Sequence, residues 1–104
     1  MGESVGVEGG VFIVEFTNVL EDSRCPMNAR CIWEGNARIA LKVRESTRGQ
    51  GTVELNTSER FPTRARYGEN TKGISIELRR LEPMPMAGAP TRDFVATLMV
   101  EAGK

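Results

Sequence analysis

The two cysteines, Cys25 and Cys31, carry the most reactive side chains of this sequence, and five residues, PMNAR, separate them. A disulfide between them would close a short loop and stabilise the fold by about 2–2.5 kcal/mol in the chain-entropy model. Redox pairs, the functional alternative, usually have a Cys-x-x-Cys spacing at a helix N-terminus, which lowers the thiolate pKa. The spacing therefore favours a structural disulfide, with free thiols or a redox pair as alternatives. A disulfide indicates an oxidising compartment: the periplasm, the cell surface or the outside.

Charged side chains surround the cysteines within residues 21–35. Glu21, Asp22 and Glu34 could bind calcium or serve as the acid and base of a hydrolase. Calcium takes about six to eight oxygen ligands, usually from closely spaced Asp, Asn and Gly residues, whereas arginines interrupt the acids here. We therefore expect Arg24 and Arg30 to pair with these acids and to brace the loop.

Trp33, the one tryptophan of the chain, belongs to the same loop. It could stack on a sugar or a peptide ligand. A lone tryptophan beside a disulfide more often covers one end of a sandwich core. We expect this second role, with the indole packed beneath the loop.

A local basic cluster, RFPTRARY, occupies residues 60–67 and interleaves arginines with Phe61 and Tyr67. This mixture of charge and aromatic rings could bind single-stranded nucleic acid. However, the 14 Lys and Arg residues of the chain balance its 14 Asp and Glu residues, and Glu59 and Glu69 flank the cluster. We therefore expect an exposed edge strand protected by arginines and no nucleic-acid partner.

Histidine does not occur in the sequence. The chain therefore has no imidazole to act as a general base, to activate a nucleophile or to bind a metal. Two cysteines cannot complete a four-ligand zinc site of the usual type within one chain. These absences close the commonest routes to catalysis, although carboxylates and lysines can also catalyse reactions. We assign no catalytic residue and no metal site, expect no cofactor, and interpret the protein as a non-enzyme.

The elements that must position these residues are β-strands, because apolar and polar residues alternate with a period of two. Five segments show this pattern clearly: residues 11–20, 37–43, 52–56, 73–81 and 93–101. Residues 4–7 and 64–67 could add two short edge strands, and a change of phase between Leu78 and Leu81 predicts a bulge. No window supports an amphipathic helix of normal length. The sequence predicts one all-β domain over residues 1–104, an antiparallel β-sandwich of about six or seven strands, with a small β-barrel as the alternative.

The longest apolar stretch, residues 11–14, is far too short to cross a bilayer, so we expect no transmembrane segment. The first residues, MGESVG, have neither the basic start nor the apolar run of a signal peptide. If the protein is exported, we expect the export signal to lie upstream of residue 1.

The run NVLEDSRCPMNARCIWEGNARIALKV resembles a group of small bacterial envelope proteins, many of them predicted lipoproteins. Their domains read approximately V-x-x-DSRCP-x(4–5)-C-x-W/A-x-G-x-A followed by a strand. The later segments ISIELRRLEPMP and FVATLMV also look like the C-terminal half of that group. The resemblance implies an exported, sandwich-like domain with bridged cysteines, and it implies no particular activity. The matching residues are Asp22, Ser23, Arg24, Cys25, Pro26, Cys31, Trp33, Gly35 and Ala37.

The leading hypothesis is a non-enzymatic β-sandwich module with an interaction or structural role in the periplasm, in the cell envelope or outside the cell. A protein partner would bind at the loop of residues 83–90 or at the loop of residues 21–35, whose candidate contacts are Asp22, Arg24, Arg30, Trp33 and Glu34. One alternative is a thiol-redox or stress protein that uses Cys25 and Cys31. Another is a protease inhibitor that presents the disulfide-braced loop with its two arginines, Arg24 and Arg30, exposed.

Overall fold

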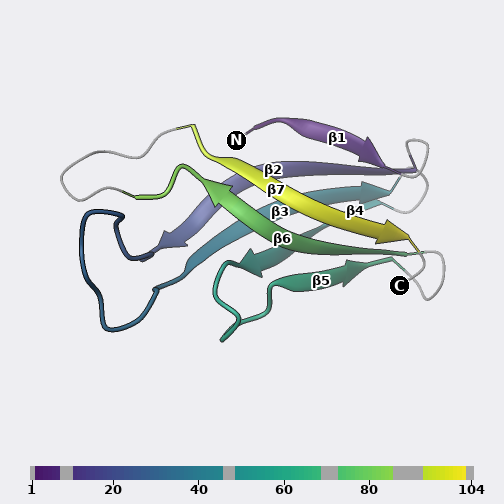
Figure 1. The fold of residues 1–104 in the computed structure, drawn as a ribbon. Coiled ribbons are helices and arrows are strands. Elements are labelled where there is room, and N and C mark those ends of the chain that lie inside the picture. The colour runs from purple at the N-terminus through teal and green to yellow at the C-terminus, as the bar shows by residue number, and fades with distance from the viewer. Residues whose placement is uncertain (1, 8–10, 46–48, 69–72, 86–92, 103–104) are drawn as a thin grey trace.

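The computed structural model describes residues 2–7, 11–45, 49–68, 73–85 and 93–102, which form seven β-strands in two antiparallel sheets (Figure 1). The first sheet contains, in spatial order, β1 (Ser4–Val7), β2 (Phe12–Asp22), β3 (Ala37–Glu45) and β4 (Gly49–Asn56). The second contains β5 (Arg64–Tyr67), β6 (Ile74–Glu82) and β7 (Val95–Ala102). The prediction of an antiparallel β-sandwich is confirmed, and the two sheets do not close into the alternative barrel. No helix of the described segments is long and apolar enough to cross a membrane.

The core lies between the two sheets and consists of the inward side chains of the alternating strands. Successive side chains of a strand point to opposite faces, so alternate residues are buried in β2 up to Phe16, in β3 up to Val43 and in β6 up to Leu78. The strand register places inward residues opposite each other, for example Val14 opposite Val43 and Phe16 opposite Leu41. The central buried residues are Phe12, Val14, Phe16, Ile39, Leu41, Val43, Leu55, Ile74, Ile76, Leu78 and Leu81.

Two strands contain irregularities that change which residues face the core. In β6 the register shifts between Leu78 and Arg80, and this shift returns Leu81 to the interior. The predicted bulge is therefore confirmed. In β2 two further shifts follow Phe16, so the end of this strand leaves the alternating pattern before it enters the disulfide loop.

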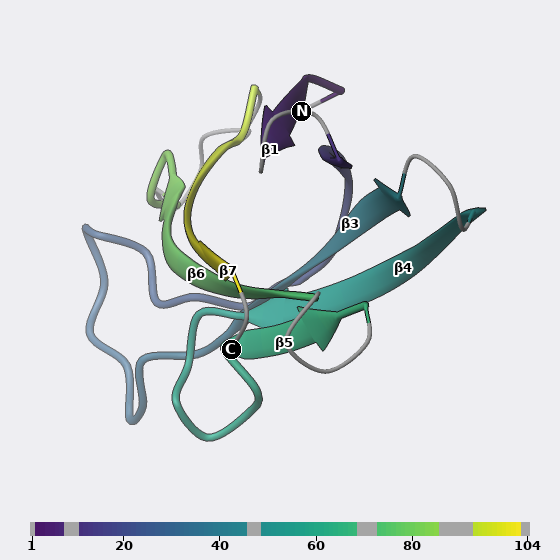
Figure 2. The same ribbon diagram turned by 90° about the vertical axis from the view of Figure 1, so that its right-hand side faces the viewer.

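The sheets lie next to each other along β4 and β5, as the end-on view shows (Figure 2). Residues 57–63 connect these two strands. Within this connection the N–H of Asn56 donates to the carbonyl of Pro62 at 2.9 Å, and the N–H of Leu78 in β6 donates to Thr63 at 2.8 Å. These bonds hold this side of the sandwich together.

Candidate functional site

The loop that joins β2 to β3 contains both cysteines and is closed twice at its base. The N–H of Ser23 donates to the carbonyl of Asn36 at 2.7 Å, and the N–H of Cys25 donates to Glu34 at 2.9 Å. These bonds continue the pairing of the two strands into the loop. Cys25 and Cys31 then form a disulfide, with their Cα atoms 5.9 Å apart. The predicted disulfide is confirmed, and the loop is anchored at its base. Figure 1 shows this loop as the long dark-blue connection between β2 and β3.

Arg24 lies beneath the loop and connects the two sheets. Its Nε and Nη2 atoms contact the two carboxylate oxygens of Asp22 at 2.7 and 2.9 Å. Nη1 donates to the carbonyl of Leu81 at 2.6 Å, and Nη2 also donates to the carbonyl of Pro83 at 3.0 Å. These two carbonyls lie at the end of β6, where strand pairing ends. A planar guanidinium can bind both oxygens of a carboxylate and two carbonyls together through four hydrogen bonds, whereas a lysine has only three N–H donors.

The burial of Arg24 corrects one expectation. The inhibitor hypothesis required this arginine to be exposed, but only 5% of its side chain is accessible. The physical reason is that Arg24 is needed to pair carbonyl oxygens of the opposite sheet. Its pairing with Asp22 agrees with the predicted brace, but the pairing expected for Arg30 is not found within the described segments.

Gly35 determines how the chain returns from the loop into β3. Its φ angle is +74°, in the left-handed region that favours glycine. A Cβ atom at this position would collide with the backbone carbonyl of Ser23. The close approach of the two loop ends therefore requires glycine here.

A buried amide pair extends the anchoring from the loop to the connection between β4 and β5. Asn36 Nδ2 donates to Asn56 Oδ1 at 2.9 Å, and Asn36 Oδ1 accepts the N–H of Ser58 at 3.0 Å. Asn56 Nδ2 donates in turn to the carbonyl of Pro62 at 2.8 Å. Sequence analysis did not find these residues, because strand alternation places both amides on the outward face. The turn of residues 57–62 covers them.

Trp33 and Glu34 contact this same turn. The guanidinium of Arg60 lies 5.1 Å from the centre of the Trp33 ring, within the range of a cation–π contact. Trp33 is half-buried and does not pack against the core cluster, so the expectation that it covers one end of the sandwich core is wrong. The Ser58 hydroxyl donates to Glu34 Oε1 at 2.9 Å. A hydrogen bond from the Glu34 backbone lowers the pKa of this carboxyl below its ordinary value of 4.5, and the Ser58 hydroxyl and the Arg60 charge lower it further.

The tip of the loop exposes apolar side chains. Ile32 is fully exposed and Met27 is 70% exposed, and the exposed Arg30 makes no ion pair within the described segments. Beneath them, the N–H of Met27 donates to the carbonyl of Pro85 at 2.9 Å. Sequence analysis singled out neither Met27 nor Ile32. Their apolar character in a stretch outside the alternating strand pattern was the signal in the sequence that could have indicated their exposure.

The five candidate contacts of the loop therefore divide into two pairs and one single residue. Asp22 and Arg24 are used inside the protein, and Trp33 and Glu34 contact the neighbouring turn. Arg30 is left at the exposed tip. Of the second predicted contact loop, residues 83–90, positions 86–90 lie outside the described residues.

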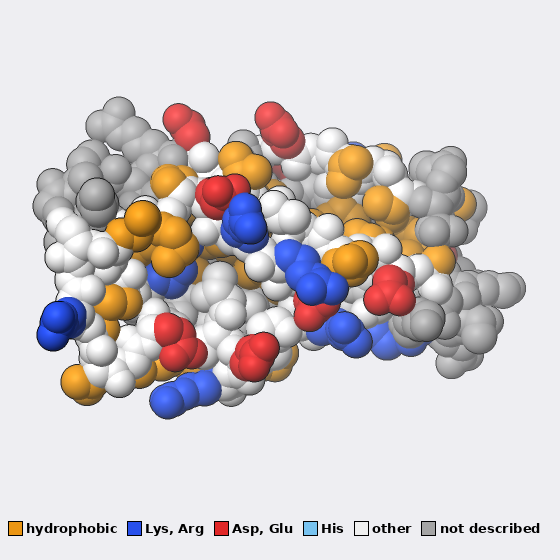
Figure 3. Space-filling view, in the orientation of Figure 1, with side chains coloured by type: hydrophobic (Ala, Val, Ile, Leu, Met, Phe, Trp, Pro, Cys, Tyr) orange, Lys and Arg blue, Asp and Glu red, His pale blue; other side chains and the backbone are white. Residues whose placement is uncertain are grey.

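The basic segment of residues 60–67 forms a turn followed by the edge strand β5, as predicted. Arg64 of β5 contacts Glu77 of β6 at 3.5 Å, and Arg79 contacts the same carboxylate at 3.2 Å. On the face drawn in Figure 3, basic and acidic side chains are interspersed and do not gather by sign.

No group of three or more acidic or cysteine side chains in the described ranges is placed to hold a metal ion. Comparison of the chain with protein-family models, with curated proteins and with solved structures found no match.

Proposed function

We propose that the protein is a non-enzymatic binding module of the periplasm, the cell envelope or the extracellular space. In this proposal the tip of the disulfide loop, formed by Met27, Arg30 and Ile32, contacts a protein partner. The observation that carries the proposal is the full exposure of Ile32 on a loop whose base is fixed. An exposed isoleucine contributes nothing to the core of its own domain. It can gain burial only from another molecule.

The anchoring of the loop supports this role. A contact surface loses less conformational entropy on binding when it is already ordered. The disulfide, the two backbone bonds at the base and the buried Arg24 each restrict the loop. The three tip side chains therefore stand on an ordered support.

The chemistry of the tip indicates the kind of partner. Met27 is flexible and adapts to an irregular apolar surface, while Ile32 is stiff and branched. Arg30 adds one positive charge that could pair with a carboxylate at the rim of the contact. A partner protein with an apolar depression bordered by an acidic residue would match this arrangement.

The proposed compartment is supported by the disulfide, because such bonds persist in oxidising environments. It is supported also by the resemblance of residues 18–43 to bacterial envelope proteins.

Site-specific photo-crosslinking in the source organism tests the proposal. A photoreactive residue at position 32 is expected to form an adduct with an envelope protein, whereas the same residue at the exposed strand position 52 forms none. The adduct at position 32 should be lost on Met27→Ser. Equal labelling from positions 32 and 52, or no adduct from position 32, would contradict the proposal.

A stability control separates binding from folding. Ile32→Ser should change the free energy of unfolding by less than about 0.5 kcal/mol, because the side chain is fully exposed. Urea unfolding measures this change. A large loss would show that Ile32 serves the fold, and the proposal would then lose its basis.

The thiol-redox alternative has one observation in its favour, the exposure of Cys31 on the surface of the loop. An exposed sulfur is accessible to an attacking thiol. Equilibration of the folded protein in glutathione buffers, followed by thiol trapping and mass analysis, distinguishes the roles. A reduction potential below about −300 mV marks a structural bridge, and one near −200 mV supports the redox role.

A further inference from the structure

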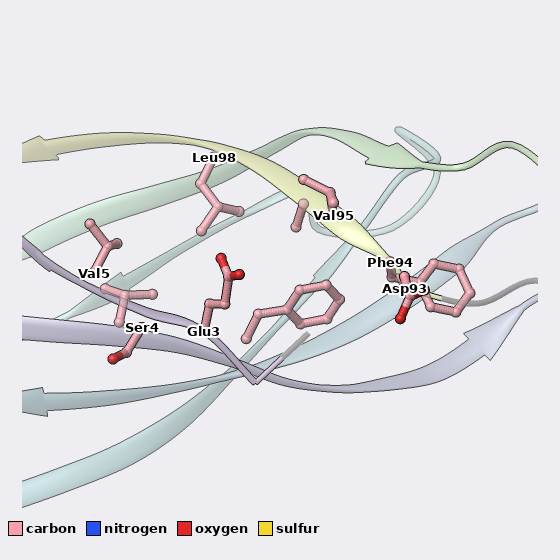
Figure 4. A pocket seen from close by; sticks show the side chains of 10 residues that line it. Glu3, Ser4, Val5, Asp93, Phe94, Val95 and Leu98 are labelled. Carbon is pink, nitrogen blue, oxygen red and sulfur yellow. The ribbon is translucent and has the colours of Figure 1, made fainter.

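A groove separates the two edge strands on the side of the sandwich opposite β4 and β5. In the described segments β1 pairs only with β2, and β7 pairs only with β6. Each strand therefore has one backbone edge without a strand partner. Between them lies a groove of about 470 Å³, lined from β1, β2 and β7 (Figure 4).

Core side chains form the floor and one wall of this groove. Val14 and Phe16 of β2 lie at the bottom and are buried. Ala96 and Leu98 of β7, with the preceding Phe94, form the wall and are only half-buried, although their alternation points them to the interior. The wall therefore leaves apolar surface that no strand of the described chain covers.

The groove carries negative charge. Its two ionisable lining residues are Glu3 and Asp93, and no lysine or arginine of the described residues lines it. Figure 4 shows the Glu3 carboxylate pointing from the start of β1 into the space toward β7. An occupant that matches this lining combines apolar side chains with a positive charge.

An exposed edge is a template for strand addition, in which main-chain hydrogen bonds provide affinity and alternate side chains fill pockets. The edge of β7 has eight residues and that of β1 has four. At roughly 3.3 Å per residue, β7 can pair with an extended segment about 26 Å long. The edge of β7 is therefore the better template.

We propose that the groove between β1 and β7 receives an extended segment of a partner polypeptide, which pairs with the edge of β7 that no strand of the described segments occupies. The alternate apolar side chains of this segment pack on Phe16, Ala96 and Leu98. A lysine or arginine at one end of the segment lies near Glu3 and Asp93. This site is separate from the tip of the disulfide loop and does not depend on it.

The probe for the test is a synthetic peptide of eight residues, a lysine followed by alternating valine and threonine. In one control peptide glutamate replaces the lysine, and in the other proline replaces one central threonine. NMR titration of the labelled protein at peptide concentrations up to a few millimolar reports binding residue by residue. The lysine peptide should shift the NMR signals of the β7 amides. The glutamate peptide carries the wrong charge and the proline peptide lacks one main-chain donor, so each should bind at least tenfold more weakly.

Protein variants locate the binding site. Replacing both acids, Glu3→Gln with Asp93→Asn, should weaken binding of the lysine peptide about tenfold. Thr97→Lys, on the outward face of β7, is the matched control and should leave the affinity within about twofold. The two acids are exposed, so these variants keep the fold, which the NMR spectrum verifies.

Three outcomes would overturn the proposal. The β7 amides do not respond to millimolar lysine peptide, or the proline peptide binds equally well, so that strand pairing is not used. In the third, the protein sediments as a dimer without peptide and the β7 amides shift when the dimer is diluted to the monomer, so that a second copy of the chain occupies the groove.

Discussion

The disulfide-bearing sandwich is closed by polar contacts at the base of the loop and is open between β1 and β7. At the base of the loop, buried polar side chains satisfy backbone groups: Arg24 binds two carbonyls at the end of β6, and Asn36 and Asn56 bind each other and the adjoining turn. Along β1 and β7, by contrast, apolar side chains border an open groove. A buried polar group requires one partner at one geometry, whereas an apolar wall accepts any surface of suitable shape. The base of the loop is therefore complete, and the groove can take an occupant.

The largest effect should come from removing the guanidinium of Arg24, which closes the sandwich at the base of the loop. Arg24→Leu leaves the Asp22 carboxylate and the carbonyls of Leu81 and Pro83 without their donor. The free energy of unfolding should fall by about 3–5 kcal/mol, as measured by urea denaturation. Arg30→Leu, on the exposed tip of the same loop, is the matched control and should cost less than about 0.5 kcal/mol. Equal losses from the two variants would refute the assignment of Arg24 as the connection between the sheets.

A second prediction compares the stability cost of the same Leu→Ala substitution in the closed part of the core and beside the open groove. Leu78 of β6 and Leu98 of β7 are direct cross-strand partners, but Leu78 is buried and Leu98 is half-buried beside the groove. Leu78→Ala should cost about 3 kcal/mol and Leu98→Ala about 1 kcal/mol, because the second truncation removes contacts on one side only. Chemical denaturation of both variants measures the difference. A similar cost at both positions would mean that the groove is not open in solution.

The smallest effect concerns the pH dependence of stability that comes from Glu34, beside the base of the loop. Its folded pKa lies below 4.5, mainly because of a hydrogen bond from its own backbone and a second from Ser58. The ionised form is therefore favoured in the folded state. This contribution is present above pH 4.5 and is lost as the pH falls through the folded pKa.

Thermal unfolding of the wild type and of Glu34→Gln from about pH 3 to pH 7 tests this pH dependence. The wild type should melt higher at neutral pH, and the two curves should converge in acid. Glu59→Gln, in the adjoining turn, controls for the change in net charge. A gap between wild type and Glu34→Gln that persists to the lowest pH would contradict the assignment.

Much of the strand framework was predictable from the sequence. Alternation over residues 37–43 and 73–81 located strands, because one face of each is buried and the other is not. The change of phase after Leu78 located the bulge, and the spacing of the cysteines favoured the disulfide. These features depend on local pattern, which the order of residues expresses directly.

The use of individual polar residues was not predictable in the same way. Arg24 reaches the carbonyl of Leu81 across a separation of 57 residues, whereas the charge pattern of the loop predicted the same pairing with acids for Arg24 and for the exposed Arg30. Asn36 and Asn56 are buried because a turn from a later segment covers them. The groove, too, depends on how far two edge strands lie apart after the sheets have packed. All three features are products of tertiary arrangement.

The order of strands within the sheets bears on how the chain folds. Every strand pairing of the described chain joins strands that follow each other in the sequence. Each sheet can therefore be assembled by adding successive hairpins, without closing a long loop first. Residues far apart in sequence meet when the two finished sheets dock. The bond from Arg24 to Leu81 forms when the sheets dock. If docking follows the rate-limiting barrier, substitutions at Arg24 should mainly raise the unfolding rate. If docking is itself the barrier, they should mainly lower the folding rate.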